Sequence, residues 1–302
     1  MCNYMENEVK DTRIIIDGVS KCFKNGCVAL RDINLEIKPG IFGLIGKNGA
    51  GKTTLMKCIC TIYKPSEGDI KIFGNDVLRD SSEIRKNIGY LPQEFELYNH
   101  LSVEAMLEYL AGIKGIYDKA KVLHAIEIVG LNDKRKCKIK ELSGGMKRRV
   151  GIAQAIIGEP QLLIVDEPTA GLDPDERVRF RNVLLDYASR GKTVILSTHI
   201  VEDIAATCED IALLDKGKVK YSGRLENMIK KAQNKIYEKR MRTQEELEHF
   251  KKVYKVLSTS YSEKGIRVKY TGETLDGTER LSTDISLEDA VVYFLGGALT
   301  NE

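Results

Sequence analysis

The spacing of apolar residues along the chain changes between strand-like and helix-like stretches. Short apolar runs separated by turn residues predict strands over 13–16, 28–30, 33–37, 41–45, 69–74 and 88–93. From Leu101 to Gly158 the apolar positions recur every three or four residues, which predicts helices. Nearly uninterrupted apolar runs at 161–165 and 193–198 are typical of strands in a buried parallel sheet. The pattern predicts an α/β fold with a helical insertion at about 95–158.

Beyond a predicted hairpin at 211–223 the composition changes. Residues 230–255 carry many basic side chains, which favours a solvated face, with a membrane-facing surface as the alternative. Thr243 and Glu246 have capping-box spacing, residues 253–270 are typical of a hairpin, and Ser286 precedes a last helix. We therefore expect a main domain over 1–223 and a small α+β appendage over 224–302.

Composition excludes several broad classes of protein. The 302 residues are 42% hydrophobic and 30% charged with a net charge of +3, so no strong field favours nucleic acid. The N-terminus lacks the apolar core of a signal peptide, and no apolar run approaches the ~18 residues of a membrane span. The seven scattered cysteines indicate reduced thiols in the cytosol, and Cys58 and Cys60 are interpreted as helix packing rather than a metal site.

The strongest chemical motif is Gly46-Lys47-Asn48-Gly49-Ala50-Gly51-Lys52-Thr53. It lies between an apolar run and a helix-like run, which is the context of a phosphate-binding P-loop rather than of an ordinary glycine-rich turn. The glycines allow backbone N–H groups to point at a polyanion, and the following helix adds its positive dipole end. Lys52 can then reach the β- and γ-phosphates while Thr53 ligates Mg²⁺.

Ionisable side chains follow both buried strands. Asp166 and Glu167 end the first, and His199 ends the second. Ligands of open α/β sheets bind at the carboxyl ends of the strands, so these side chains are poor candidates for a merely solvated turn. Asp173 and Pro174 then have the spacing of a helix cap and first helical residue.

Two further positions admit two interpretations each. Ser143-Gly144-Gly145 opens a helix, and it is either a ligand-binding helix start or an ordinary Ser-capped helix. Phe23 lies in a polar turn, where it is either an aromatic platform for a purine or a core residue of an edge strand.

Taken in order, the aromatic turn, the P-loop, Gln93, the Leu142-Ser143-Gly144-Gly145 stretch, the two acids, Asp173 and His199 resemble the ATP-binding subunit of an ABC transporter. The resemblance covers residues 13 to about 223 and implies a P-loop NTPase core with an antiparallel β subdomain. Within the family, Tyr90-Leu91-Pro92-Gln93 and Leu287-Glu288-Asp289 look more narrowly like bacterial exporters for drugs or bacteriocins.

The resemblance also implies a role for each motif residue. Phe23 stacks on adenine, and the ATP phosphates are cradled by Gly46, Asn48, Gly49, Ala50, Gly51, Lys52, Thr53 and Thr54. Mg²⁺ is held by Thr53, Gln93 and Asp166. Glu167 polarises the attacking water and His199 contacts the γ-phosphate, with Lys52 and Gln93 completing the catalytic set. Ser143 and Gly145 close over the ATP of a second protomer, and Asp173 links the two sites.

These roles imply partners. We expect a homodimer, although pairing with a different ATPase chain is the alternative, and separate transmembrane permease subunits that dock a helix near residues 93–98. The complex would lie at the inner face of the cell membrane, with no nucleic acid bound. Met146 departs from the glutamine of many relatives, without a predicted loss of activity. Rival interpretations are an importer subunit, a soluble ABC ATPase acting on DNA or ribosomes, and a regulator without turnover.

Overall fold

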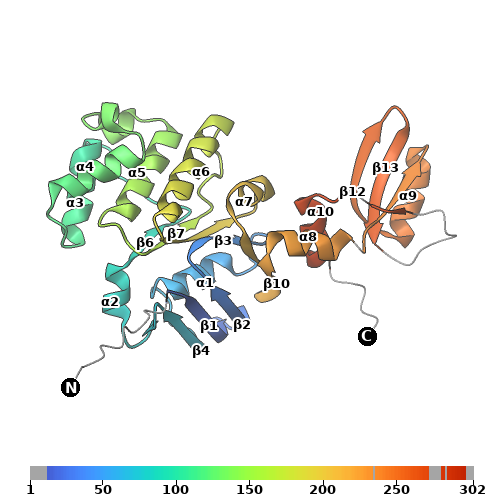
Figure 1. Cartoon of the computed structure of the whole chain (residues 1–302), viewed down its shortest axis with the longest axis horizontal. Helices are drawn as coiled ribbons and strands as arrows, with labels where there is room; N and C mark the ends of the chain where they lie inside the picture. The colour runs from blue at the N-terminus through green and yellow to red at the C-terminus, as the bar shows by residue number, and fades with distance from the viewer. Residues whose placement is uncertain (1–11, 234, 272–279, 283, 297–302) are drawn as a thin grey trace, which may run out of the picture. The chain divides into compact units, whose positions relative to one another are not determined.

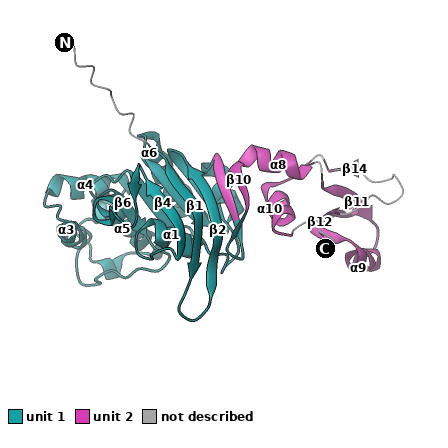
Figure 2. Ribbon diagram, turned by 90° about the horizontal axis from the view of Figure 1, so that it is seen from below, with its two compact units in different colours: residues 1–208, 214–219 teal, residues 209–213, 220–302 magenta. Residues whose placement is uncertain are grey.

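The computed structural model describes residues 12–233, 235–271, 280–282 and 284–296 (Figure 1). The chain divides into two compact units, one of residues 1–208 and 214–219, the other of residues 209–213 and 220–302 (Figure 2). The strands β9 (Asp210–Asp215) and β10 (Lys218–Arg224) form the predicted hairpin, and the division between the units passes through both.

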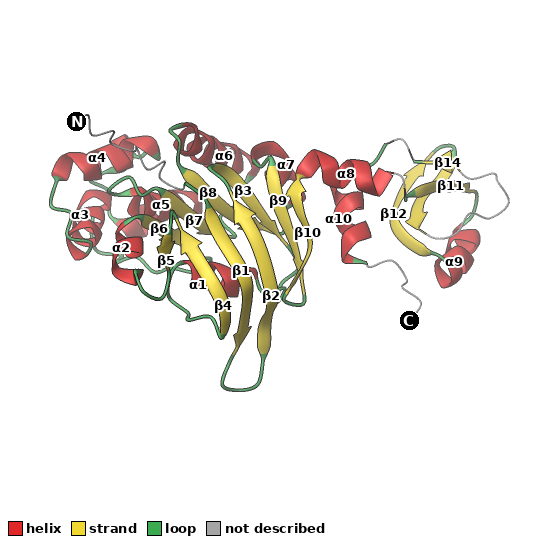
Figure 3. Ribbon diagram, turned by 60° about the horizontal axis from the view of Figure 1, so that its bottom comes forward, coloured by secondary structure: helices red, strands yellow, loops and turns green. Residues whose placement is uncertain are grey.

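The first unit begins with an antiparallel sheet in the order β2-β1-β4-β5, and Figure 3 shows β2, β1 and β4 as long neighbouring strands. Its strands are β1 (Ile14–Cys22), β2 (Val28–Ile37), β4 (Glu67–Ile72) and β5 (Asn75–Asp76). Where the apolar pattern predicts two short strands, β2 is continuous. Asp32 adopts a positive φ of 52° and the β1–β2 register shifts between Val19 and Lys21, so an irregularity interrupts the apolar alternation without ending the strand.

A parallel sheet forms the centre of the first unit. Its strands β3 (Gly40–Ile45), β8 (Thr193–Thr198), β7 (Leu162–Asp166) and β6 (Ile88–Leu91) pair in that order. Every residue of β7 and β8 is buried, as their apolar runs predict. Helix α6 (Pro174–Ser189) connects β7 to β8, while α1 (Lys52–Ile59) follows β3, α2 (Ser81–Lys86) precedes β6 and α7 (Val201–Thr207) follows β8. The predicted P-loop α/β fold with an antiparallel subdomain is confirmed.

Three helices lie within the stretch where helical spacing of apolar residues was found. They are α3 (Val103–Ile113), α4 (Lys119–Ile128) and α5 (Gly144–Ile156), with short 3₁₀ turns at Asn132–Lys134 and Ile139–Glu141. Ser102, Asp118 and Ser143 cap the three helices by accepting a hydrogen bond from a backbone N–H of the first turn. Their apolar faces pack on one another around fully buried residues such as Leu107 and Ile126.

The second unit contains an antiparallel sheet in the order β12-β13-β11-β14 with helix α9 on one face. Its elements after β10 are α8 (Leu225–Gln233), β11 (Tyr237–Met241), α9 (Gln244–Val253), β12 (Lys255–Ser262), β13 (Gly265–Thr271), β14 (Arg280–Leu281) and α10 (Leu287–Leu295). Thr243 caps α9 and Ser286 opens α10 in a capping box with Asp289, as their sequence spacings predict. Leu247, Phe250, Val268 and Tyr270 form its core.

The basic residues between 230 and 255 are distributed over α8, β11, α9, β12 and the segments that connect them. Lys239, for example, places its ammonium over the ring of Phe250 at 5.7 Å. Among the described residues, no helix is both long enough and apolar enough to cross a membrane.

Candidate functional site

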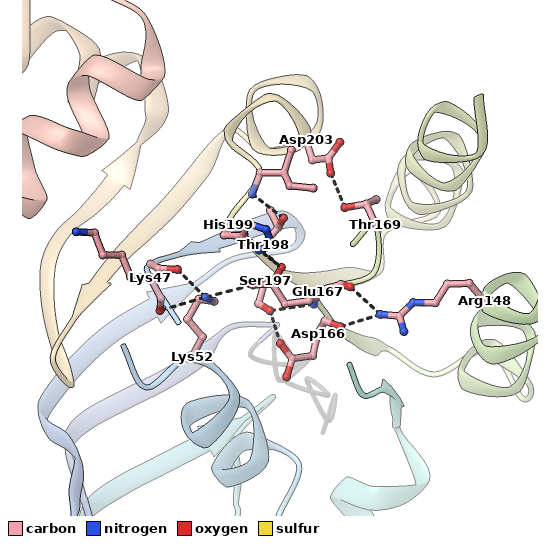
Figure 4. A network of polar contacts seen from close by, with 12 residues as sticks. Lys47, Lys52, Arg148, Asp166, Glu167, Thr169, Ser197, Thr198, His199 and Asp203 are labelled. Carbon is pink, nitrogen blue, oxygen red and sulfur yellow. Dashed lines mark hydrogen bonds and ion pairs between the residues drawn. The ribbon is translucent and has the colours of Figure 1, made fainter. Parts of the chain in front are cut away.

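The carboxyl ends of β3, β7 and β8 bring three of the predicted catalytic residues together, as Figure 4 shows. Lys52 begins the helix that follows β3, Glu167 follows β7, and His199 follows β8. The Lys52 Nζ lies 3.2 Å from the Glu167 Oε1, and both side chains are almost completely buried. Parallel register produces this arrangement, because Asp166 pairs with Ser197 and Ile45 with Thr198 at the same edge.

The phosphate loop depends on glycine at two kinds of position. Gly49 and Gly51 have φ angles of 81° and 107°, which side chains with a Cβ rarely adopt. A Cβ on Gly46 would lie 2.5 Å from the Leu214 carbonyl oxygen, so only glycine fits there. Gly51 is also the N-terminal flanking residue of α1, and no side chain caps this helix. Its first N–H groups are therefore suited to an anionic ligand.

Lys52 is folded back into the loop that it follows. Its Nζ donates to the Gly46 carbonyl at 2.6 Å, with the Lys47 carbonyl at 3.5 Å. The Glu167 Oε1 lies at ion-pair distance, yet within the described part of the chain this buried oxygen has no partner of hydrogen-bond geometry. We therefore treat the Lys52–Glu167 contact as a charge attraction rather than as a directed hydrogen bond. An ammonium held in this way can turn towards a phosphate oxygen.

Glu167 is held by contacts at its carboxylate and at its main chain. The Oε2 lies 2.7 Å from the His199 Nδ1 and accepts from the His199 backbone N–H at 3.3 Å. The Glu167 N–H donates to the Ser197 carbonyl at 3.0 Å, with the Ser197 hydroxyl at 3.2 Å. Its φ of 47° is unusual for a residue other than glycine, and such a conformation persists only where neighbouring groups enforce it.

Asp166 has one satisfied and one unsatisfied oxygen. Its Oδ1 accepts from the Ser197 hydroxyl at 2.5 Å, while the fully buried Oδ2 has no hydrogen-bond partner among the described residues. The Tyr90 hydroxyl is likewise buried without a hydrogen-bond partner among the described residues. Burial, and to a smaller extent the negative charge of Asp166, raises the pKa of Tyr90. A buried carboxylate oxygen without a partner fits a nearby cation or cation-bound water.

A magnesium ion therefore fits the chemistry of this edge. Thr53, Gln93 and Asp166 offer a hydroxyl, an amide oxygen and a carboxylate, all of which are oxygen ligands of the kind that Mg²⁺ prefers. Across the described residues there is no cluster of three or more acidic, histidine or cysteine side chains that could hold a metal alone. Mg²⁺ commonly completes its ligands with water and with the phosphates of its substrate, so such a cluster is not required.

Three predicted residues, Ser143, Gly145 and Asp173, lie at the starts of the helices α5 and α6. Ser143 accepts from the Met146 N–H at 3.2 Å and Asp173 from the Glu176 N–H at 2.8 Å, so each caps a helix and is exposed to solvent. A Cβ on Gly145 would lie 2.9 Å from the Glu176 Cγ, so a larger residue would displace that side chain. Gln93 is exposed.

Phe23 lies in the turn between β1 and β2, as predicted, and not within an edge strand. Its half-exposed ring meets the Tyr63 ring edge-on at a centroid distance of 5.5 Å, and the Lys21 ammonium lies 5.4 Å from its centroid. The ring is therefore supported on one side by Tyr63 and is still accessible.

Sequence reasoning missed residues that organise this edge. Ser197 contacts both acids, and it is detectable as a polar residue near the end of an otherwise apolar strand. Thr169 donates to the buried Asp203 carboxylate at 2.5 Å, which joins the segment after Glu167 to α7. Arg148 donates to the carbonyls of Asp166 and Glu167 from α5. The contacts of Arg148 have no local sequence signal because they span 18 residues or more.

Comparison with known proteins agrees with this geometry. Residues 30–170 match the family described as ABC transporter. An uncharacterized ABC transporter ATP-binding protein of Nostoc sp. is 36% identical over 208 residues, which are 67% of this chain and 62% of that protein. The methionine import ATP-binding protein MetN of Clostridium acetobutylicum is 37% identical over 72% of this chain and 70% of its own length. A dimeric ATP-binding cassette bound to ADP and Pi in a post-hydrolysis state has a TM-score of 0.64 and 28% identity over 70% of this chain and 98% of that one.

Proposed function

The chain belongs to the ABC transporter family and is an ATPase, and from this premise we propose that it dimerises around two ATP molecules and drives export through separate membrane subunits. The observation that supports the ATP-hydrolysis part of this proposal is the convergence of Lys52, Glu167 and His199 at one edge of the parallel sheet. A merely structural ion pair would not require a phosphate loop beside it or a strained backbone at Glu167.

In the proposed reaction, backbone N–H groups of residues 46–53 and the Lys52 ammonium bind the ATP phosphates. The negative charge of the γ-phosphate attracts the Lys52 ammonium away from Glu167. The Lys52–Glu167 contact lacks hydrogen-bond geometry, so this movement breaks no directed hydrogen bond between the two side chains. The Glu167 carboxylate is then free to accept a proton from a water aligned with the γ-phosphate, while His199 contacts the phosphate oxygens. Mg²⁺, held by Thr53, Gln93 and Asp166, would supply charge stabilisation to the phosphates.

We place the second half of each site on a partner protomer. Ser143 caps α5 and is exposed, Gly145 in the first turn is half-buried, and an added Cβ on Gly144 would meet nothing within 4 Å. A two-fold dimer brings one protomer's helix start to the other's phosphate loop, where Asp173 lies between the two sites. Phe23 would stack on adenine with the ring face that Tyr63 does not support.

A membrane subunit needs a docking place, and the helical insertion offers one. A hollow of about 410 Å³ is lined by Phe95, Glu96, Leu97, Asn99, Ile139 and Lys147. Tyr98 beside it is 58% exposed, and its ring meets that of Tyr109 at 5.6 Å. We propose that a helix of the permease binds here, which places the chain on the inner face of the cell membrane. The functional division would then be residues 1–223 for ATP hydrolysis and 224–302 as an appendage.

Export is proposed from the likeness of residues 90–93 and 287–289 to bacterial exporters. Import is a second candidate, because one relative is a methionine import protein. A nucleic-acid or ribosome role is not favoured, since the net charge is only +3 and the chain carries one P-loop motif. A regulator without turnover is not favoured because the Glu167 carboxylate is present.

The proposal is tested with the membrane subunit that co-purifies with the chain. That subunit is expected to raise the ATPase rate of the purified chain, and Leu97→Arg in the hollow is expected to abolish this stimulation. Ile113→Arg is the matched control, because Ile113 is exposed on α3 and does not line the hollow. Transport in inside-out vesicles then gives the direction, since an exporter accumulates cargo there. Equal stimulation of both variants would contradict the docking place.

A further inference from the structure

Arg148 joins four main-chain carbonyls from two places in the sequence, Gln93 and residues 166–168. Its Nη1 donates to the Gln93 carbonyl at 2.6 Å and its Nε to the Pro168 carbonyl at 3.0 Å. Its Nη2 donates to the Asp166 carbonyl at 3.1 Å and to the Glu167 carbonyl at 2.7 Å. One side chain of α5 thus holds both the Gln93 segment and the end of β7.

The setting of this guanidinium is unusual for a helix-surface arginine. It is half-buried, its carbon centre lies 5.4 Å from the centroid of the Phe95 ring, and all four of these hydrogen bonds end on carbonyl oxygens. Burial lowers the pKa of Arg148, while the charges of Asp166 and Glu167 oppose that shift. A planar group with five donors in a fixed fork suits this task, since a lysine ammonium is a single compact donor centre.

The Glu167 peptide explains why such a clamp is needed. Glu167 has a φ of 47°, a left-handed conformation that is costly for a residue with a Cβ. Ser197 holds its N–H, and Arg148 holds its carbonyl at 2.7 Å. Backbone strain of this kind persists only where surrounding contacts over-determine it. Without Arg148, the peptide after Glu167 loses the contact that fixes its carbonyl end.

We propose that Arg148 is a positioning residue for ATP hydrolysis, which fixes the Glu167 backbone and the Gln93 segment to the helix that Ser143 begins. The inference rests on the proposed role of Glu167 as the group that activates water. Arg148 itself touches no reacting atom and acts through the placement of the Glu167 carboxylate. Because Ser143 caps α5, a shift of this helix would be transmitted through the Arg148 side chain to the Glu167 carboxylate.

The first test compares ATPase kinetics of the wild-type chain with Arg148→Ala, Arg148→Lys and the control Lys114→Ala. Lys114 also donates to a carbonyl of α5, that of Gln154 at 2.7 Å, but far along the helix from the catalytic edge. Charged hydrogen bonds predict that Arg148→Ala lowers kcat by about 10- to 100-fold, with KM for ATP changed by less than about threefold. Arg148→Lys should fall between Arg148→Ala and wild type, and Lys114→Ala should retain wild-type kcat.

A second measurement separates positioning from general destabilisation. Single-turnover hydrolysis is compared in Glu167→Gln and in the double variant Glu167→Gln, Arg148→Ala. If Arg148 acts through the Glu167 carboxylate, the second substitution adds less than about a twofold loss, because the effects of coupled residues are not additive. A full additional loss would overturn the proposal and indicate a structural contribution.

Other results would also overturn it. Wild-type kcat in folded Arg148→Ala, an equal loss in Lys114→Ala, or a higher KM with unchanged kcat each contradicts positioning. If Arg148→Ala does not fold, Arg148→Lys alone decides, since wild-type kcat in that variant contradicts the need for several donors. Should Glu167→Gln hydrolyse ATP at the wild-type rate, the proposed role of Glu167 fails. If Glu167→Gln is inactive while Arg148→Ala is not impaired, only the role of Arg148 fails.

Discussion

Each unit of the chain buries a carboxylate against a lysine, and the two pairs are completed in different ways. In the second unit, Asp289 receives the Lys269 ammonium at 2.6 Å, the Ser258 hydroxyl at 2.7 Å and the Ser286 N–H at 3.1 Å. In the first unit, the Glu167 Oε1 lies 3.2 Å from Lys52 without hydrogen-bond geometry, and the adjacent Asp166 Oδ2 has no partner among the described residues.

The number of hydrogen bonds that each carboxylate accepts separates a structural ion pair from a reactive one. Burial alone raises the pKa of Asp289, but the hydrogen bonds from Lys269, Ser258 and Ser286 outweigh it and hold that pKa below its usual value. These contacts therefore stabilise the charged form of Asp289, and its carboxylate has a structural role. In the first unit, Asp166 and Glu167 each have one buried oxygen without a hydrogen-bond partner among the described residues, and the Glu167 backbone is strained. These features destabilise the fold, and a bound substrate or cation can offset that destabilisation.

The largest expected effect separates the two carboxylates by activity. Glu167→Gln should lower the ATPase rate by about 10²- to 10⁴-fold, because general-base assistance has that value, while ATP binding is retained. Asp289→Asn should leave the rate per folded molecule unchanged. Steady-state phosphate release by both variants checks this. A Glu167→Gln rate close to wild type would remove the contrast between the pairs.

The second prediction compares the two ion pairs by their contribution to stability rather than to activity. Asp289→Asn should destabilise the second unit by about 3 kcal/mol, because it leaves the largely covered Lys269 ammonium without its charged partner. Hydrogen exchange checks this, since peptides of β13 and α10 should exchange faster while those of β7 do not change. Glu288→Gln is the matched control, as Glu288 is the exposed neighbour of Asp289. Equal protection in both variants would show that the ion pair contributes nothing.

The same pair predicts a pH dependence with a definite sign. Because the folded pKa of Asp289 is depressed, its contribution to stability is present above the unfolded pKa and is lost as the pH falls through the folded one. Protection of β13 and α10 in the wild-type chain should therefore decrease from about pH 4 downwards, around the ordinary Asp pKa. Asp289→Asn should show a weaker decrease over that range. A decrease of the same size in both proteins would assign the acid sensitivity to other groups.

The sequence predicted the features that a local pattern encodes, and it did not predict contacts between segments that are distant in the chain. The buried strands at Leu162–Asp166 and Thr193–Thr198 and the phosphate loop were predictable because a local pattern encodes them. The helix α8 was not predicted, although its apolar residues recur at helical spacing. The strand β11 was not predicted because three charged residues separate Tyr237 from Met241. The contacts of Ser197 and Arg148 join segments that are distant in sequence, and only the register of the strands places them together.

A smaller effect is expected on the affinity for ATP, and it again compares a residue of the first unit with one of the second. Phe23→Ala should weaken ATP binding by about 5- to 150-fold, because the stacking of a base on an aromatic ring contributes roughly 1–3 kcal/mol. Tyr261→Ala is the control, an exposed aromatic ring of the second unit. Titration of each folded variant with ATP and with ATP plus Mg²⁺ checks this. An unchanged Kd for Phe23→Ala would leave that ring with its structural contact to Tyr63 alone.

The smallest effect tests whether the site of the first unit is shared between protomers. Lys52→Ala and Ser143→Arg should each be inactive, because every dimer then contains two defective sites. In a mixed dimer, one protomer contributes a sound phosphate loop and the other a sound Ser143, so one complete site results. Random pairing at equal amounts makes half the dimers mixed, and about a quarter of wild-type sites should return. The rate of the mixture and its ATP occlusion are both measured, because strict coupling could silence a dimer with one complete site. A mixture that neither hydrolyses nor occludes more ATP than the separate variants would place Ser143 and Lys52 in one protomer's site.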